Sequence, residues 1–155
     1  MAEAWGTVVI KGDDSIVDLI KADDESIEWA SMESLFLALG LGQLKDSHYK
    51  LEYCKGNSFY HEGIQRGNGI ASISIFGDEW MPVVDVLAKN ARGIEIYARI
   101  RDEYGTSAYY ILTKEEQRFN SSLDYECGVE ESEEAEFEKQ WSSLVPSEIK
   151  ATYFS

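Results

Sequence analysis

The chain has 155 residues, 44% of them hydrophobic and 12% aromatic, and carries a formal net charge of −15 at pH 7. This apolar content excludes intrinsic disorder, and the length predicts a single domain over residues 1–155. The negative charge argues against direct binding of nucleic acid or anionic membranes and favours a basic partner surface.

The charge is concentrated in two segments. Sixteen of the 29 acidic residues lie within 13–33 and 124–138, which together contain one basic residue, Lys21. No apolar run reaches the roughly 20 residues of a membrane span, and the N-terminus lacks the basic start and apolar core of a signal peptide. We therefore expect a cytoplasmic protein. The two cysteines, Cys54 and Cys127, match no metal motif and are expected to be thiols.

The first half of the chain predicts strands and helices in alternation. β-Branched residues closed by Gly-Asp predict a strand over 6–11. Asp14 or Ser15 is expected to cap a helix, and another helix is expected to span 31–40, where Gly40 and Gly42 end it. Alternating apolar residues predict a strand over 48–54. The four glycines of 56–69 predict a loop.

The second half predicts a strand over 70–76, a helix over 79–90, and then three strands joined by short turns. These strands span 94–101, 107–113 and 118–125 and form an antiparallel meander. The strand over 94–101 alternates isoleucine with charged or tyrosine residues, which predicts one buried and one solvent-facing side.

The C-terminal region predicts an acidic helix over 130–145 that docks on the body of the domain. Its apolar residues recur at helical spacing, and its glutamates cluster in the first turns, where a helix favours negative charge. The docking residues are Phe137, Trp141, Leu144 and Val145. Residues 151–154 are expected to add an edge strand.

These elements together predict an α+β sandwich related to the ferredoxin-like arrangement, with a mostly antiparallel sheet and helices on one face. Two segments also resemble a known family: Trp5 followed by a strand ending in Gly12-Asp13, and Trp80-Met81-Pro82 opening a helix before the meander. They resemble ferredoxin-like proteins carried by plasmids and phages. The chain departs from that family at Gly6, where a cysteine is usual. The resemblance implies a fold and a mobile-element origin, and it carries no catalytic residue.

Catalytic and metal-binding patterns are weak in this sequence. His48 and His61, with Glu52 and Glu62 nearby, would suit a general base or a metal pair, but their spacing matches no ligand motif. The glycine-rich segment 63–69 lacks the Gly-Lys-Ser/Thr ending of a phosphate-binding loop. We therefore predict no catalytic residue, no metal ligand and no cofactor.

Two other groups of charged residues suggest alternative functions. Arg99, Arg101 and Arg118, interleaved with tyrosines, resemble an RNA-binding surface, but the overall charge opposes this and intramolecular ion pairs are favoured. Clustered aspartates near 13–14 and 23–25 lack the pattern of a calcium-binding loop.

The two acidic segments support the leading functional hypothesis. Carboxylates along a rigid helix can approach the charge density of duplex DNA, so that a basic groove accepts the protein in place of nucleic acid. We expect a non-enzymatic, anti-CRISPR or other anti-defence inhibitor from a phage or plasmid, which binds a host nucleic-acid-processing complex as a DNA mimic. The predicted contacts are Glu130, Glu131, Glu133, Glu134, Glu136 and Glu138, then Asp23, Asp24, Glu25 and Glu28.

Three alternatives stay open. The acidic segments would also suit a purely solubilising surface. The strands Ile70–Phe76 or Ile94–Ile100 would suit an oligomerisation module if they offered a free sheet edge. The two histidines would suit a small hydrolase.

Overall fold

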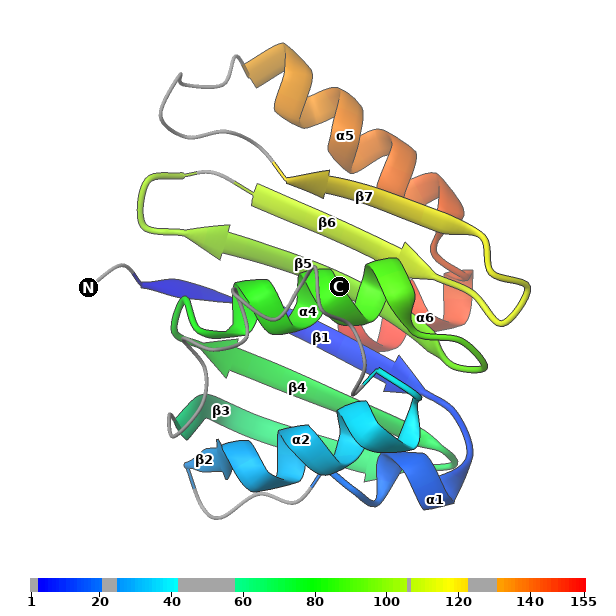
Figure 1. The fold of residues 1–155 in the computed structure, drawn as a ribbon. Helices are drawn as coiled ribbons and strands as arrows, with labels where there is room; N and C mark the ends of the chain where they lie inside the picture. Colours follow the sequence, from blue (N-terminus) through cyan, green and yellow to red (C-terminus); the bar gives the residue numbers. More distant parts are fainter. Residues whose placement is uncertain (1–2, 21–24, 42–57, 106, 123–130) are drawn as a thin grey trace.

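The computed structural model describes residues 3–20, 25–41, 58–105, 107–122 and 131–155. Within them, seven strands form one antiparallel sheet in the order β2-β3-β4-β1-β5-β6-β7 (Figure 1). The strands are β1 (Ala4–Lys11), β2 (Ser26–Glu28), β3 (Ser58–Gly67), β4 (Ile70–Phe76), β5 (Glu95–Asp102), β6 (Ser107–Leu112) and β7 (Arg118–Ser122). The helices of the described part are α1 (Asp14–Val17), α2 (Trp29–Ala38), α4 (Trp80–Asn90), α5 (Glu131–Leu144) and α6 (Ser147–Tyr153).

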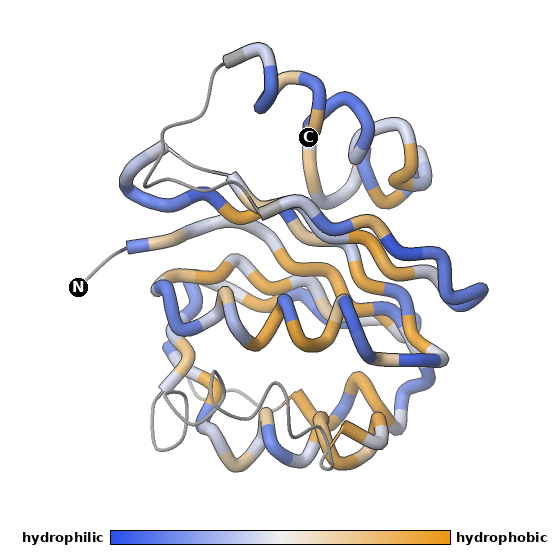
Figure 2. The backbone as a smooth tube through the Cα atoms, turned by 45° about the horizontal axis from the view of Figure 1, so that its top comes forward, coloured by the Kyte–Doolittle hydropathy of each residue, from blue (hydrophilic) through white to orange (hydrophobic). Residues whose placement is uncertain are grey.

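Helices cover both faces of the sheet, so the prediction of helices on one face is wrong. On one face, alternate residues of β1 such as Val8 pack in a cluster with Leu35 of α2 and Val83 of α4. On the other face, Val9 shares a second cluster with Trp141 of α5. Figure 2 shows the sheet between these two layers, with the largely hydrophilic α5 on the far side from α2 and α4.

The second layer covers only part of its face. All six residues of β6 are buried, which an antiparallel strand with one solvated face would not allow. β4 instead alternates, with Ala71, Ile73 and Ile75 buried and Ser74 and Phe76 exposed. The half of the sheet around β5 and β6 is therefore covered on both faces, and the half around β3 and β4 on one.

The glycine-rich stretch before β4 is a strand, so the loop predicted over 56–69 is wrong for its described residues. β3 runs to Gly67, and the two-residue turn Asn68-Gly69 leads directly into β4. Both turn residues have positive φ, 54° and 74°, as a type I′ hairpin turn requires. The strand predicted over 48–54 and the two cysteines lie outside the described residues.

Gly6 allows close approach of β1 to β5. A Cβ at this position would overlap the carbonyl oxygen of Arg99 and lie 2.9 Å from Cα of Ile100. Both obstacles are backbone, so they cannot rotate away. The chain therefore has no room for a side chain at the position where the resembled family usually has a cysteine.

The C-terminal segment closes the second layer as two helices. Residues 147–153 form α6, so the edge strand predicted over 151–154 is wrong; Ile149 and Phe154 are buried against the sheet. In α5, Trp141 and Val145 after it face the sheet, whereas Leu144 is 51% exposed and does not dock as predicted.

The remaining predicted elements are close to those observed. The strands over 70–76, 94–101 and 107–113 and the helix over 79–90 correspond to β4, β5, β6 and α4. Both β4 and β5 have neighbours on each side, so neither offers the free edge that the oligomerisation alternative needs. Among the described residues, no helix is both long and apolar enough to cross a membrane.

Candidate functional site

α5 is held on the sheet by an aromatic and cationic cluster. The indole of Trp141 is buried, donates a hydrogen bond to the carbonyl oxygen of Tyr110 at 3.2 Å, and meets the ring of Phe154 edge-on with centroids 4.9 Å apart. The guanidinium of Arg99 lies 5.5 Å from the Trp141 ring centroid and 5.8 Å from that of Phe154. Such contacts fix the orientation of the helix as well as its position.

The glutamates of α5 divide into two groups. Glu134 accepts a hydrogen bond from the hydroxyl of Ser107 at 2.8 Å, and Glu138 pairs with Arg99 at 3.5 Å, so both also help to hold the helix. Glu133 and Glu136 are exposed. Glu130 lies outside the described residues. Glu138 is exposed as well, although it pairs with Arg99, so Glu133 and Glu136 are the exposed members of the predicted contact set that do not also hold the helix on the sheet.

The charge of α5 also reaches the sheet below it. Burial raises the pKa of Tyr109, and the negative charges of Glu138 and Glu134 raise it further, against the opposing effects of Ser107 and Arg99. Tyr109 therefore stays protonated and neutral in the physiological range.

The first acidic segment lies at the other end of the molecule. Glu25 precedes β2 and Glu28 is its last residue; β2 is an edge strand next to β3, whereas α5 packs mainly on β6 (Figure 1). Glu28 accepts hydrogen bonds from the hydroxyls of Ser26 and Ser58. Asp23 and Asp24 lie outside the described residues. The described parts of the two acidic segments thus do not combine into one contact surface.

The described residues form no catalytic or metal-binding site around the histidines. His61 lies at a bulge in β3, and both of its ring nitrogens are buried without a hydrogen-bond partner among the described residues. His48 lies outside the described residues, so the pair cannot be compared. In the described ranges, no group of three or more His, Cys, Asp or Glu side chains is arranged to hold a metal ion.

Two of the three arginines proposed for RNA contacts have structural partners. Arg99 pairs with Glu138, and Arg118 donates to the carbonyl oxygens of Ala88 and Ala91 at 2.8 and 2.9 Å, at the C-terminal end of α4. A cation there offsets the negative end of the helix dipole. These arginines stabilise the fold, which weakens the RNA-binding alternative.

The uncovered part of the sheet carries an aromatic cluster that the sequence analysis missed. Trp5 pairs with Phe76, and Phe76 with Tyr60, so the three residues lie side by side on β1, β4 and β3. Their exposed fractions are 42%, 37% and 50%. We call these three residues the aromatic floor.

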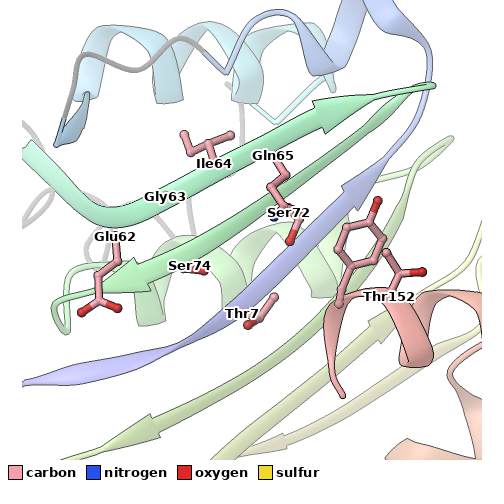
Figure 3. Close-up of a pocket in the computed structure, with 9 residues that line it drawn as sticks. Thr7, Glu62, Gly63, Ile64, Gln65, Ser72, Ser74 and Thr152 are labelled. Carbon is pink, nitrogen blue, oxygen red and sulfur yellow. The ribbon is translucent and has the colours of Figure 1, made fainter.

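A shallow depression of about 330 Å³ adjoins the aromatic floor. Thr7, Ser72 and Ser74 line it from β1 and β4, and Gln65 lines it from β3 (Figure 3). Thr152 and Tyr153 of α6 close its far end, and Glu62 and Gly63 lie toward the aromatic floor. The lining is thus rich in hydroxyl groups.

The alternation within β4 was the available signal for this face. Ser72, Ser74 and Phe76 alternate with three apolar residues, which indicates that one face of this strand is not packed in a core. The neighbours of Phe76 depend on the strand order and have no such signal.

Comparison of the chain with protein-family models, curated proteins and solved structures gave no match.

Proposed function

We propose that the chain is a non-enzymatic cytoplasmic inhibitor from a mobile element, which binds a host nucleic-acid-processing defence complex such as a CRISPR or restriction effector. The observation that supports this most is the outward pair Glu133 and Glu136 on a helix that Trp141 fixes to the sheet. A fixed helix presents carboxylates at constant spacing, which a basic groove can match.

The charge density of α5 suits such a groove. Five glutamates of the helix fall between positions 131 and 138, a length of about 10 Å at a rise of about 1.5 Å per residue. That is about one charge per 2 Å along the helix, against about one per 1.7 Å along duplex DNA, but Glu134 and Glu138 also bond to Ser107 and Arg99. Binding would then be steered electrostatically and would weaken as salt rises.

A ferredoxin-like core and a mobile-element origin form part of the proposal. The order β1, α2, β3, β4, α4, β5 along the chain, with β3-β4-β1-β5 across the sheet, supports a split βαβ arrangement. The sequence resemblance to plasmid and phage proteins supports the origin.

The test is binding of the purified chain to a panel of purified CRISPR and restriction effectors, measured at low and high salt. The variant is Glu133→Lys with Glu136→Lys. Its matched control is Glu103→Lys with Glu115→Lys, because these exposed residues lie in turns and change the net charge equally. We expect the α5 variant to lower the association rate about tenfold or more and the control to lower it far less.

Three results would contradict the proposal. Equal loss in both variants would show that only the net charge matters, and unchanged binding by the α5 variant would remove α5 from the interface. Absence of binding to every effector at low salt would reject the target class.

A further inference from the structure

The aromatic floor places three large aromatic side chains side by side at the protein surface, which is unusual. Trp5, Tyr60 and Phe76 span three neighbouring strands, a width of about 10 Å at the usual strand spacing of about 4.8 Å. Contiguous exposed aromatic residues of this kind mark binding surfaces, because they leave apolar surface in contact with water that a bound ligand would cover. In the described part of the molecule, α5 and α6 pack beside this surface and leave it open.

The depression beside the aromatic floor holds polar groups without partners. Ser72 is only 8% exposed and lines the depression. Among the residues that the structure describes, none hydrogen-bonds to the side chains of Ser72, Thr7 or Gln65. These groups face the depression, so a ligand hydroxyl placed there can bond to them in place of water.

We propose that this face binds a neutral oligosaccharide, with sugar rings stacked on the aromatic floor and sugar hydroxyls bonded in the depression. The electron-rich faces of aromatic rings attract the polarised C–H groups on the flat side of a pyranose. The hydroxyls of Thr7, Ser72 and Ser74 and the amide of Gln65 can each donate and accept, as sugar hydroxyls also do. A few such polar groups beside an apolar surface are the usual composition of a ligand site.

Charge favours a neutral ligand over the alternatives. Arg101 lies opposite Trp5 on the neighbouring strand. Glu62 lines the depression, and Glu3 lies two residues before Trp5 in the chain. One positive and two negative groups, on a chain of net charge −15, give no cationic track for a phosphate backbone. No residue of α5 lines the depression, so the site is independent of the proposed inhibitor function.

The test is titration of the full chain with defined neutral oligosaccharides: glucose, mannose, galactose and N-acetylglucosamine oligomers. The signal is the indole N–H resonance of Trp5 with the backbone amides of β1, β3 and β4. Oligothymidylate and an arginine-rich peptide serve as charged comparators. A Kd of about 1 mM is visible at ligand concentrations up to about 10 mM.

We expect one oligosaccharide series to shift these resonances. Trp5→Ala should then weaken binding about tenfold, and Ser72→Ala about fivefold. Leu37→Ala, which removes an exposed apolar side chain on α2 at the opposite face, should bind as the unmodified chain does.

Three results would overturn the assignment. They are no shift with any neutral series, binding that survives both Trp5→Ala and Ser72→Ala, or shifts of Trp5 by a charged comparator alone. The last result would assign the face to nucleic acid or to a basic peptide. Loss of effector binding in the α5 variant would have no bearing on this titration, so the two proposals fail separately.

Discussion

The two halves of the sheet contain similar residues in different surroundings. On the face that α5 and α6 share, the half around β5 and β6 has Tyr97 and Tyr109 almost fully buried, whereas the half around β3 and β4 leaves Tyr60 and Phe76 exposed. Aromatic residues on the same face therefore have two roles, one in the core and one at the surface. The difference is whether a helix packs on that part of the sheet.

The largest expected effect is at the centre of the covered half. Trp141→Ala should lower the free energy of unfolding by about 3–5 kcal/mol, because the indole is buried and its removal leaves a cavity. Trp5→Ala should lower it by less, about 1–2 kcal/mol, since Trp5 is 42% exposed. Urea denaturation followed by circular dichroism measures both. Equal losses in the two variants would abolish the distinction between the halves.

A smaller effect is expected where β1 joins the two halves. Gly6→Ala should cost about 1–3 kcal/mol, because the new Cβ meets backbone atoms of Arg99 and Ile100. Gly63→Ala is the matched control, since a Cβ there meets nothing within 4 Å, and it should cost less than about 1 kcal/mol. The same denaturation measurement applies, and a costlier Gly63→Ala would contradict the assigned contact.

The smallest expected effect is a dependence of stability on pH, which comes from a buried tyrosine in the covered half. Burial raises the pKa of Tyr97, and the hydrogen bond that its hydroxyl donates to Glu95 raises it further. The unfolded chain ionises this tyrosine near pH 10 while the folded chain keeps its proton, so stability falls above about pH 10, by at most about 1.4 kcal/mol per pH unit.

Tyr97→Phe tests this effect. At about pH 8 the variant should be less stable by about 1 kcal/mol, because the bond to Glu95 is lost. At about pH 11 the deficit should shrink or reverse, since phenylalanine does not ionise. Unfolding free energies of both proteins at both pH values measure the change, and Tyr109 contributes equally to each. A constant deficit would contradict the raised pKa.

Local signals in the sequence predicted most of the helices and strands, but not which faces of the sheet the helices cover. The alternation of isoleucine with polar residues predicts β5, yet its second face was expected to meet solvent. Instead, Tyr97 is buried and Arg99 lies against the rings of Trp141 and Phe154. Tyrosine and arginine are amphipathic, so their periodicity does not reveal whether a distant helix packs on them.

The candidate sites were predictable to different degrees. The acidic helix has a periodic apolar side, which located α5 from sequence. The partners Ser107 and Arg99, which hold Glu134 and Glu138, depend on docking and were not located in detail. Residues 5, 60 and 76 become neighbours only through the order β3-β4-β1, which no local pattern encodes. The turn Asn68-Gly69, by contrast, was a strong hairpin signal that the count of glycines obscured.

The two hydrophobic clusters imply an order of events during synthesis. The first cluster draws on residues up to Leu112, so it can form while the C-terminal segment is still being made. The second joins Val9 to Phe154 and is complete only when the chain has emerged past that residue. Until then, Tyr97, Tyr109 and Ile111 present an apolar surface to the cell. Since synthesis adds about 5–20 residues per second, this exposure lasts seconds, within which aggregation competes with docking of α5 and α6.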